Sequence, residues 1–110
     1  MFGRKSRSFS IGQKEFLEKA KEKGAHIIDV RSEQEFKEGC LSNAENIPMN
    51  RLAIHLDEIK KYVDKKEPVL LYCLSGARSK MACRFLDKQG LTEGIYDLQG
   101  GIHQWSGPLK

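Results

Sequence analysis

Short apolar runs alternate along this chain with segments whose apolar residues recur at helical spacing, and this alternation most constrains the fold. Three runs have the length and content of buried strands: 26–30 (HIIDV), 69–73 (VLLYC) and 95–98 (IYDL). Apolar residues recur at helical spacing in three other segments, one that begins after Ser10 and two over 52–63 and 78–88. Strands that alternate with helices are typical of βα units, so the sequence predicts an α/β fold with a mainly parallel central sheet and helices on both faces.

Capping residues and helix breakers mark where the other elements begin and end. Ser10 with Gln13, and Ser32 with Glu35, have the spacing of capping boxes, which predicts that a helix begins at each pair. The second of these helices should be short and end near Gly39. A further short strand is expected over 45–47, where Pro48 follows.

The 110 residues are enough for one domain, which we expect over residues 10–110, after a flexible basic tail at residues 1–9. Arg4, Lys5 and Arg7 lie in this tail, and residues 11–110 carry 16 basic against 15 acidic side chains. A nucleic-acid-binding surface is therefore not expected. No apolar stretch reaches the roughly 18 residues of a membrane span, and the basic N-terminus lacks the apolar core of a secretory signal.

Cys40, Cys73 and Cys83 form an odd set without a C-x-x-C pair, which argues against a disulfide framework and against a zinc site. The three histidines are scattered and form no metal-binding pattern, so we expect no metal. Free thiols are typical of the reducing cytoplasm, which we expect as the location.

One segment, 69–79 (VLLYCLSGARS), combines features of a functional site. A buried strand ends at Cys73, and a short loop with Gly76 leads into a helix at about Arg78. Ligands of parallel sheets bind beyond the carboxyl ends of strands, where helix N-termini present free amides. If the amides of residues 74–78 converge on the sulfur, they stabilise a thiolate, and Arg78 adds a positive charge. A lone cysteine is more often a small buried residue, but this arrangement favours a nucleophile.

This segment and three others resemble the rhodanese-like sulfurtransferase family in order and spacing over about residues 10–107. The other matching segments are Asp29-Val30-Arg31, the pair of stretches Glu35-Phe36-x-x-Gly39 and Ala44-x-Asn46-Ile47-Pro48, and Leu98-x-Gly100-Gly101-Ile102-x-x-Trp105. The family commonly has His and Gly where this chain has Cys40 and Asn43. Neither position carries the sulfur in the family, and the resemblance implies a single rhodanese-like domain.

The resemblance implies that Cys73 attacks the outer sulfur of a donor such as thiosulfate, becomes a persulfide, and passes that sulfur to cyanide or a thiol. No metal or organic cofactor is required. The loop residues Leu74, Ser75, Gly76 and Ala77 would contribute mostly backbone amides. Arg78 would either attract an anionic donor or tie the loop to one of its own carbonyls.

Three further residues are expected to support the site. Asp29 and Arg31 lie at a strand end on the same edge as Cys73, and we interpret them as a structural ion pair. Ser79 would donate a hydroxyl hydrogen bond or cap the helix. Cys83 is interpreted as a packed side chain, whereas Cys40 could resolve an oxidised Cys73.

Two other functions remain open at this point. Phosphatases and arsenate reductases also use a cysteine loop closed by arginine. The C-x-x-x-x-x-R loop of protein tyrosine phosphatases and of the related dual-specificity cell-cycle phosphatases has five intervening residues, whereas four separate Cys73 from Arg78. A non-catalytic binding module of the same family is the other alternative. The expected partners are a small sulfur donor and a cyanide or thiol acceptor, with a protein acceptor equally compatible, and neither nucleic acid nor a membrane.

Overall fold

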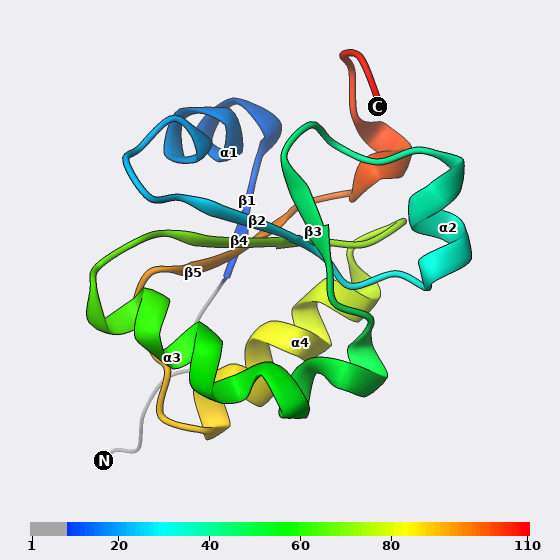
Figure 1. The fold of residues 1–110 in the computed structure, drawn as a ribbon. Helices are drawn as coiled ribbons and strands as arrows, with labels where there is room; N and C mark the ends of the chain where they lie inside the picture. Colours follow the sequence, from blue (N-terminus) through cyan, green and yellow to red (C-terminus); the bar gives the residue numbers. More distant parts are fainter. Residues whose placement is uncertain (1–8) are drawn as a thin grey trace.

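The computed structural model describes residues 9–110, in which five parallel strands form one sheet between two layers of helices (Figure 1). The strand order is β1-β5-β4-β2-β3, and every neighbouring pair is parallel. The strands are β1 (Ser10–Ile11), β2 (His26–Asp29), β3 (Ala44–Asn46), β4 (Val69–Tyr72) and β5 (Ile95–Leu98). The helices are α1 (Gln13–Ala20), α2 (Glu33–Glu38), α3 (Leu56–Asp64) and α4 (Ala77–Lys88), with 3-10 helices η1 (Met49–His55) and η2 (Ile102–Gln104).

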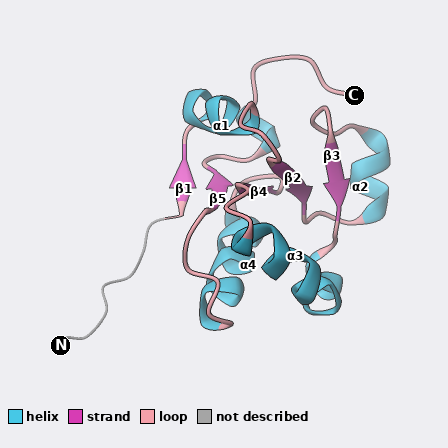
Figure 2. Cartoon of the chain, turned by 60° about the vertical axis from the view of Figure 1, so that its left-hand side comes forward, coloured by secondary structure: helices cyan, strands magenta, loops and turns pink. Residues whose placement is uncertain are grey.

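The central strand β4 shows how the sheet separates two hydrophobic cores. Successive side chains of a strand point to opposite faces. Leu70 and Tyr72 accordingly pack with Phe16 of α1, whereas Val69 and Leu71 pack in the core that includes buried residues of α3 and α4. Figure 1 shows α1 on one face of the sheet and α3 and α4 on the other, and Figure 2 shows the strands side by side in a second view. The predicted α/β architecture with helices on both faces is confirmed.

Helix α1 is held to its face of the sheet mainly by one aromatic side chain. Phe16 is fully buried and meets Trp105 edge-on, with ring centroids 6.1 Å apart. Edge-to-face pairs of this kind add to the stabilisation that comes from burial alone. Replacing Phe16 with Ala would leave a cavity and cost about 3–5 kcal/mol.

The two expected capping boxes have different outcomes. At α2 the box is confirmed, because Glu35 N donates to Ser32 Oγ and Ser32 N donates to Glu35 Oε1, both at 3.1 Å. At α1 the prediction is wrong: the N-cap is Gly12, and Ser10 belongs to β1. Ser10 pairs with β5 through its backbone, which turns its side chain toward Asp97 rather than toward the helix.

Two features at the start of the described residues, strand β1 and the buried side chain of Phe9, were not expected from the sequence. A two-residue edge strand such as β1 is too short for a periodic signal, so it was missed. Phe9 is buried in the core at 7% exposure, one residue before the expected start of the domain. Residues 1–8 of the expected tail lie outside the described residues. None of the helices within residues 9–110 is both long enough and apolar enough to cross a bilayer.

Candidate functional site

Cys73 lies immediately after β4, at the carboxyl edge of the sheet, where the chain turns into α4. Its side chain points to the sheet face that packs on α4, as do the side chains of Val69 and Leu71. The residue is 1% exposed. The position predicted from the sequence, at a strand end before a helix N-terminus, is therefore the observed one.

Two backbone amides donate to the sulfur of Cys73. Gly76 N lies 3.1 Å from Sγ, and Ser79 N, in the first turn of α4, lies 3.4 Å from it. Gly76 has a φ of 104°, a left-handed conformation that glycine adopts without strain and that turns the loop around the sulfur. The first turn of a helix has free amides and a partial positive charge, so both donors favour an anion at Sγ.

The set of donors differs in part from the expectation. Residues 74–78 were expected to supply the amides, but the hydrogen bonds to Sγ come from Gly76 and Ser79. The side chains of Leu74, Ser75 and Ala77 are exposed, so these residues contribute loop backbone rather than packed side chains.

Residues of the turn after β5 donate hydrogen bonds to two backbone carbonyl groups at the start of the Cys73 loop. Ile102 N donates to the carbonyl oxygen of Cys73 and His103 N to that of Leu74, both at 2.9 Å. Gly101 permits this close approach, because a Cβ at that position would meet the backbone of Cys73 and Leu74. The loop carbonyls therefore bond to η2, while the loop amides remain available to the sulfur.

Arg78 forms a two-point ion pair with Glu35 of α2. Its Nη1 and Nη2 atoms lie 2.8 Å from Oε1 and 3.0 Å from Oε2 of Glu35. The hydrogen bond from Arg78 is the main cause that lowers the pKa of Glu35 to about 2; burial opposes it, and the amide of Ser32 lowers the pKa further. Of the two roles considered for Arg78, the structural tie is present, but its partner is a carboxylate of another helix rather than a loop carbonyl.

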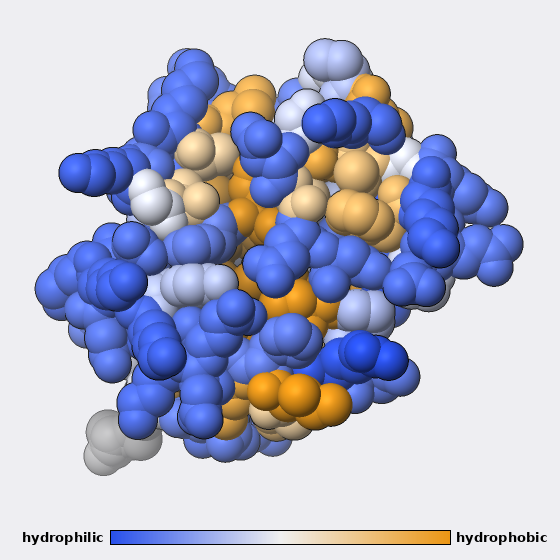
Figure 3. All heavy atoms as spheres, viewed as in Figure 1, coloured by the Kyte–Doolittle hydropathy of each residue, from blue (hydrophilic) through white to orange (hydrophobic). Residues whose placement is uncertain are grey.

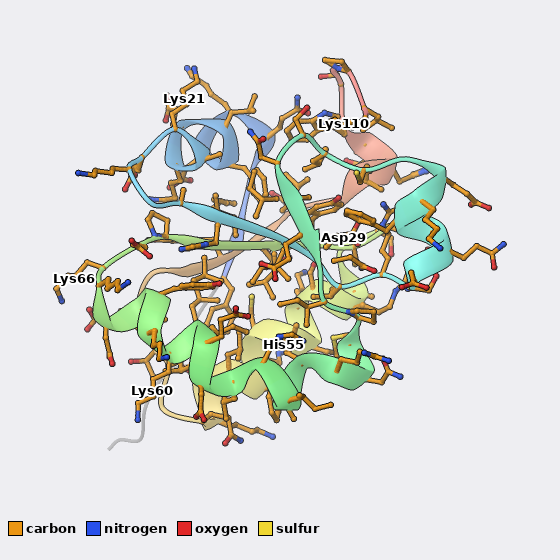
Figure 4. The ribbon with its side chains drawn as sticks, viewed as in Figure 1. Lys21, Asp29, His55, Lys60, Lys66 and Lys110 are labelled. Carbon is orange, nitrogen blue, oxygen red and sulfur yellow. The ribbon has the colours of Figure 1, made fainter. Side chains whose placement is uncertain are left out.

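Asp29 and Arg31 form the expected ion pair, and it is buried. Arg31 Nη2 lies 2.7 Å from Asp29 Oδ2 and 2.6 Å from the carbonyl oxygen of Gly39. Nearby, Leu41 N donates to the hydroxyl of Tyr72 at 3.1 Å. These bonds attach the segment after α2 to the ends of β2 and β4. Figure 4 labels Asp29 at the edge of the sheet where α2 lies, opposite the edge near Lys66.

Ser79 and Asp97 were not expected to form a unit, but the structure brings them together beneath the sulfur. Ser79 Oγ lies 3.6 Å from Sγ of Cys73 and 3.3 Å from Oδ2 of Asp97. Ser10 Oγ donates to Oδ1 of Asp97 at 2.9 Å. Ser79 was predicted as a supporting residue, whereas Asp97 and Ser10 were missed. The available signal was the single acidic residue within the otherwise apolar run of β5.

Neither of the other two cysteines takes part in the hydrogen bonds around Cys73 Sγ. Cys83 is fully buried on α4, and burial, reinforced by the charge of Asp97, raises the pKa of its thiol well above the usual range. Cys40 is also buried, and its backbone pairs with that of Lys110. All three cysteines are free. Within residues 9–110, no cluster of three or more His, Cys, Asp or Glu side chains is arranged to hold a metal ion.

A polar pocket of about 350 Å³ opens at the carboxyl edge of the sheet. It is lined by Ser32, Glu33, Asn46, Pro48, Asn50, Arg51 and His55. A more apolar pocket of about 530 Å³ lies between α1 and the segment 105–108, where Figure 3 shows apolar atoms between hydrophilic ones. The described lining of the apolar pocket includes none of residues 73–79. The described lining of the polar pocket also includes none of residues 73–79, so neither pocket contains the sulfur of Cys73.

Comparison with known proteins agrees with this geometry. A family profile described as "Rhodanese-like domain" matches residues 12–108. The chain is 44% identical over 86 residues to Bacillus subtilis YqhL, whose name describes it as uncharacterized; this match covers 78% of the chain and 64% of that relative. It is 34% identical over 95 residues to the thiosulfate sulfurtransferase GlpE of Coxiella burnetii, covering 86% of the chain and 84% of the relative.

A solved structure with the same fold comes from Staphylococcus saprophyticus. The crystal structure of SSP1007 superposes with a TM-score of 0.74 at 29% sequence identity. The superposition covers 92% of this chain and 97% of the other. The arrangement of sheet and helices is therefore shared over nearly the whole length of both chains.

Proposed function

The chain belongs to the rhodanese-like domain family, and from this we propose that it is a sulfurtransferase that carries a sulfane sulfur on Cys73. The observation that supports the proposal most directly is the pair of amide hydrogen bonds from Gly76 and Ser79 to Sγ. A thiolate is the nucleophilic form of cysteine, and donors fixed in advance stabilise it without reorganisation.

In the first half of the reaction, the thiolate of Cys73 attacks the outer sulfur of thiosulfate. A new S–S bond forms as the original S–S bond of the donor breaks, and sulfite leaves with the bonding electron pair. The product is a persulfide anion on Cys73. The amides that face Sγ, and the helix N-terminus behind them, favour negative charge before and after this step.

In the second half, a nucleophilic acceptor attacks the outer sulfur of the persulfide. Cyanide yields thiocyanate and a thiol yields a new persulfide, and in both cases Cys73 leaves as a thiolate. The cycle involves neither a metal nor an organic cofactor. A polysulfide or a persulfide of another molecule serves as donor by the same displacement, and a protein thiol serves as acceptor.

The proposal places this reaction in a reducing cytoplasm, where Cys73 would be returned to its free thiol between cycles. It involves no nucleic acid and no membrane. Cys73 is 1% exposed, so the proposal requires a local movement that lets the donor reach the sulfur. Arg78 lies at the end of the loop, and in this proposal its guanidinium contributes positive charge near an anionic donor while it stays bonded to Glu35.

Intact mass spectrometry after mixing the reduced protein with thiosulfate tests the proposal. The wild type should gain one sulfur atom, the gain should be absent in Cys73→Ser, and cyanide should remove it. Cys83→Ala is the matched control and should still load, because none of the hydrogen bonds to Sγ involves Cys83. If neither thiosulfate nor polysulfide adds sulfur to the wild type, the proposal is contradicted, and the two alternatives, a binding module and a phosphatase or arsenate reductase, are favoured instead.

A further inference from the structure

A row of buried polar atoms leads from the sulfur of Cys73 into the protein. Ser79 Oγ lies 3.6 Å from Sγ and 3.3 Å from Asp97 Oδ2, and Ser10 Oγ lies 2.9 Å from Asp97 Oδ1. Cys73 is 1% exposed, and Ser79 and Asp97 are fully buried. The row therefore joins the nucleophile to a carboxyl group that bulk water does not contact.

The fold fixes this juxtaposition through the register of two strands and one helix. Asp97 pairs with Leu71 across β4 and β5, and both side chains point to the α4 face, as Cys73 does. Ser79 lies in the first turn of α4, directly over this face. The three groups thus come from three elements that share one side of the sheet.

The environment of Asp97 is unusual for a carboxylate. Its hydrogen-bond donors are the hydroxyls of Ser10 and Ser79, and within residues 9–110 no Lys, Arg or His forms an ion pair with it. A buried charge without a cationic partner is costly, and such a group often takes up a proton instead. Burial accordingly raises the pKa of Asp97, against smaller opposing effects of Ser10 and Ser79.

The single hydroxyl proton of Ser79 allows two consistent arrangements. With a thiol at Cys73, Sγ donates to Ser79 Oγ, and Ser79 donates to the Asp97 carboxylate. With a thiolate at Cys73, Ser79 donates to Sγ, and Asp97 completes the row only as a carboxylic acid that donates to Ser79. The carbonyl oxygen of Gly76, 3.2 Å from Ser79 Oγ, is a competing acceptor.

We propose that Asp97 accepts the proton of the Cys73 thiol through the hydroxyl of Ser79. The S–H bond of Cys73 breaks as its proton moves to Ser79 Oγ, and the original proton of Ser79 moves to Asp97 Oδ2. The site keeps a total charge of one negative unit, now on sulfur, and the reverse shift restores the thiol. No external base needs to enter the closed loop. This inference rests on the proposed sulfurtransferase function, for which it explains how the nucleophilic thiolate forms.

Other groups near Asp97 must be considered in any pH experiment. From α4, the charge of Lys80 lowers the pKa of Asp97, and Asp97 in turn raises that of Cys83. Ser10 of β1 donates to Asp97 and carries no charge. Neither Lys80 nor Cys83 lies in the hydrogen-bonded row, so substitutions of Asp97 and Ser79 address the row itself.

The pH dependence of Cys73 alkylation by iodoacetamide tests the proposal without requiring sulfur transfer. The alkylation rate is measured at a series of pH values in protein that also carries Cys83→Ala. Asp97→Asn should slow alkylation about tenfold at about pH 6, and the difference should close by about pH 9, where solvent base removes the proton. If Asp97 acted only through its negative charge, Asp97→Asn would speed alkylation, since a nearby anion disfavours a thiolate. Faster or unchanged alkylation at low pH therefore overturns the proposal.

Ser79 provides a second pair of variants in case Asp97→Asn does not fold. Ser79→Thr keeps the hydroxyl and should keep the pH profile of the wild type, whereas Ser79→Ala should lose rate at low pH. Equal profiles for the two variants overturn the proposal. Asp57→Asn removes an exposed carboxylate from α3 and serves as the control for loss of a negative charge. A normal alkylation profile in protein that takes no sulfur from thiosulfate or polysulfide would contradict the proposed function and leave the proton path intact.

Discussion

The carboxylate of Glu35 accepts two hydrogen bonds from the guanidinium of Arg78, at 2.8 and 3.0 Å, although the two residues are 43 positions apart in the chain. Glu35 simultaneously caps its own helix by accepting from the amide of Ser32. One side chain therefore connects the start of α2 to the loop that surrounds Cys73. The guanidinium at the end of this loop is therefore held in one position.

Glu35→Gln tests this connection, because Gln keeps the shape and the capping contact but removes the charge. The pKa of Glu35 is lowered from 4.5 to about 2, so its stabilising effect is complete above about pH 4.5 and is lost as the pH falls toward 2. Urea unfolding should show the variant about 1 kcal/mol less stable at neutral pH, a value limited by the partial exposure of both side chains. The difference should disappear near pH 2. A constant difference across this range, or an equal effect of the exposed Glu33→Gln, would contradict the interpretation.

Gly101→Ala should both destabilise the fold and disturb the loop. A Cβ at residue 101 would lie 2.6 Å from the carbonyl oxygen of Cys73, and the backbone φ of +64° disfavours any side chain. We expect a loss of about 3 kcal/mol in unfolding free energy, together with slower sulfur loading. Gly90→Ala is the control, since its φ is also positive but its Cβ would meet nothing within 4 Å. That variant should cost about 1 kcal/mol and leave loading unchanged. Similar costs for the two variants would show that contact with the loop does not matter.

Asp29→Asn should be among the more destabilising single changes at the sheet edge. It leaves the buried guanidinium of Arg31 without its anionic partner, and Asp29 itself is fully buried. Removing one partner of a buried ion pair costs about 3–5 kcal/mol. Thermal unfolding followed by circular dichroism measures this loss. The exposed pair Lys37–Glu33, 3.9 Å apart, is the comparison, and its disruption should change the melting temperature little. A small effect of Asp29→Asn would mean that water reaches Arg31.

Cys83→Ala tests whether Cys83 contributes to the stability of the core without contributing to sulfur loading. Cys83 is fully buried between α4 and the sheet, and its raised thiol pKa keeps it protonated and unreactive at neutral pH. We expect a modest loss of stability, about 1 kcal/mol, and sulfur loading within twofold of the wild type. Peptide mapping after brief alkylation of the native wild type should find label on Cys73 and not on Cys83. Label on Cys83 before unfolding would contradict its assignment as a packed side chain.

The sequence alone determined the local features of this protein. Runs such as VLLYC and HIIDV are short, apolar and bounded by turn residues, so the central strands and the position of Cys73 before a helix were predictable. The alternation of these strands with helices made the parallel arrangement predictable as well. The Ser32–Glu35 capping box was predictable for the same reason, since both partners lie within one helical turn. Spacing between neighbouring residues carries this kind of information, and four such segments in order were enough to indicate the family.

The tertiary structure decided which distant residues meet. Period-two alternation assigns Asp97 to one face of β5, but the register of β5 against β4 and the seating of α4 place it beneath Ser79 and Cys73. The sequence also did not indicate that Arg78 pairs with Glu35, because the packing of α2 at the sheet edge brings the two side chains together. The edge strand β1 is defined by pairing with β5 rather than by any pattern of its own. These features depend on contacts between elements far apart in the chain, which local spacing does not specify.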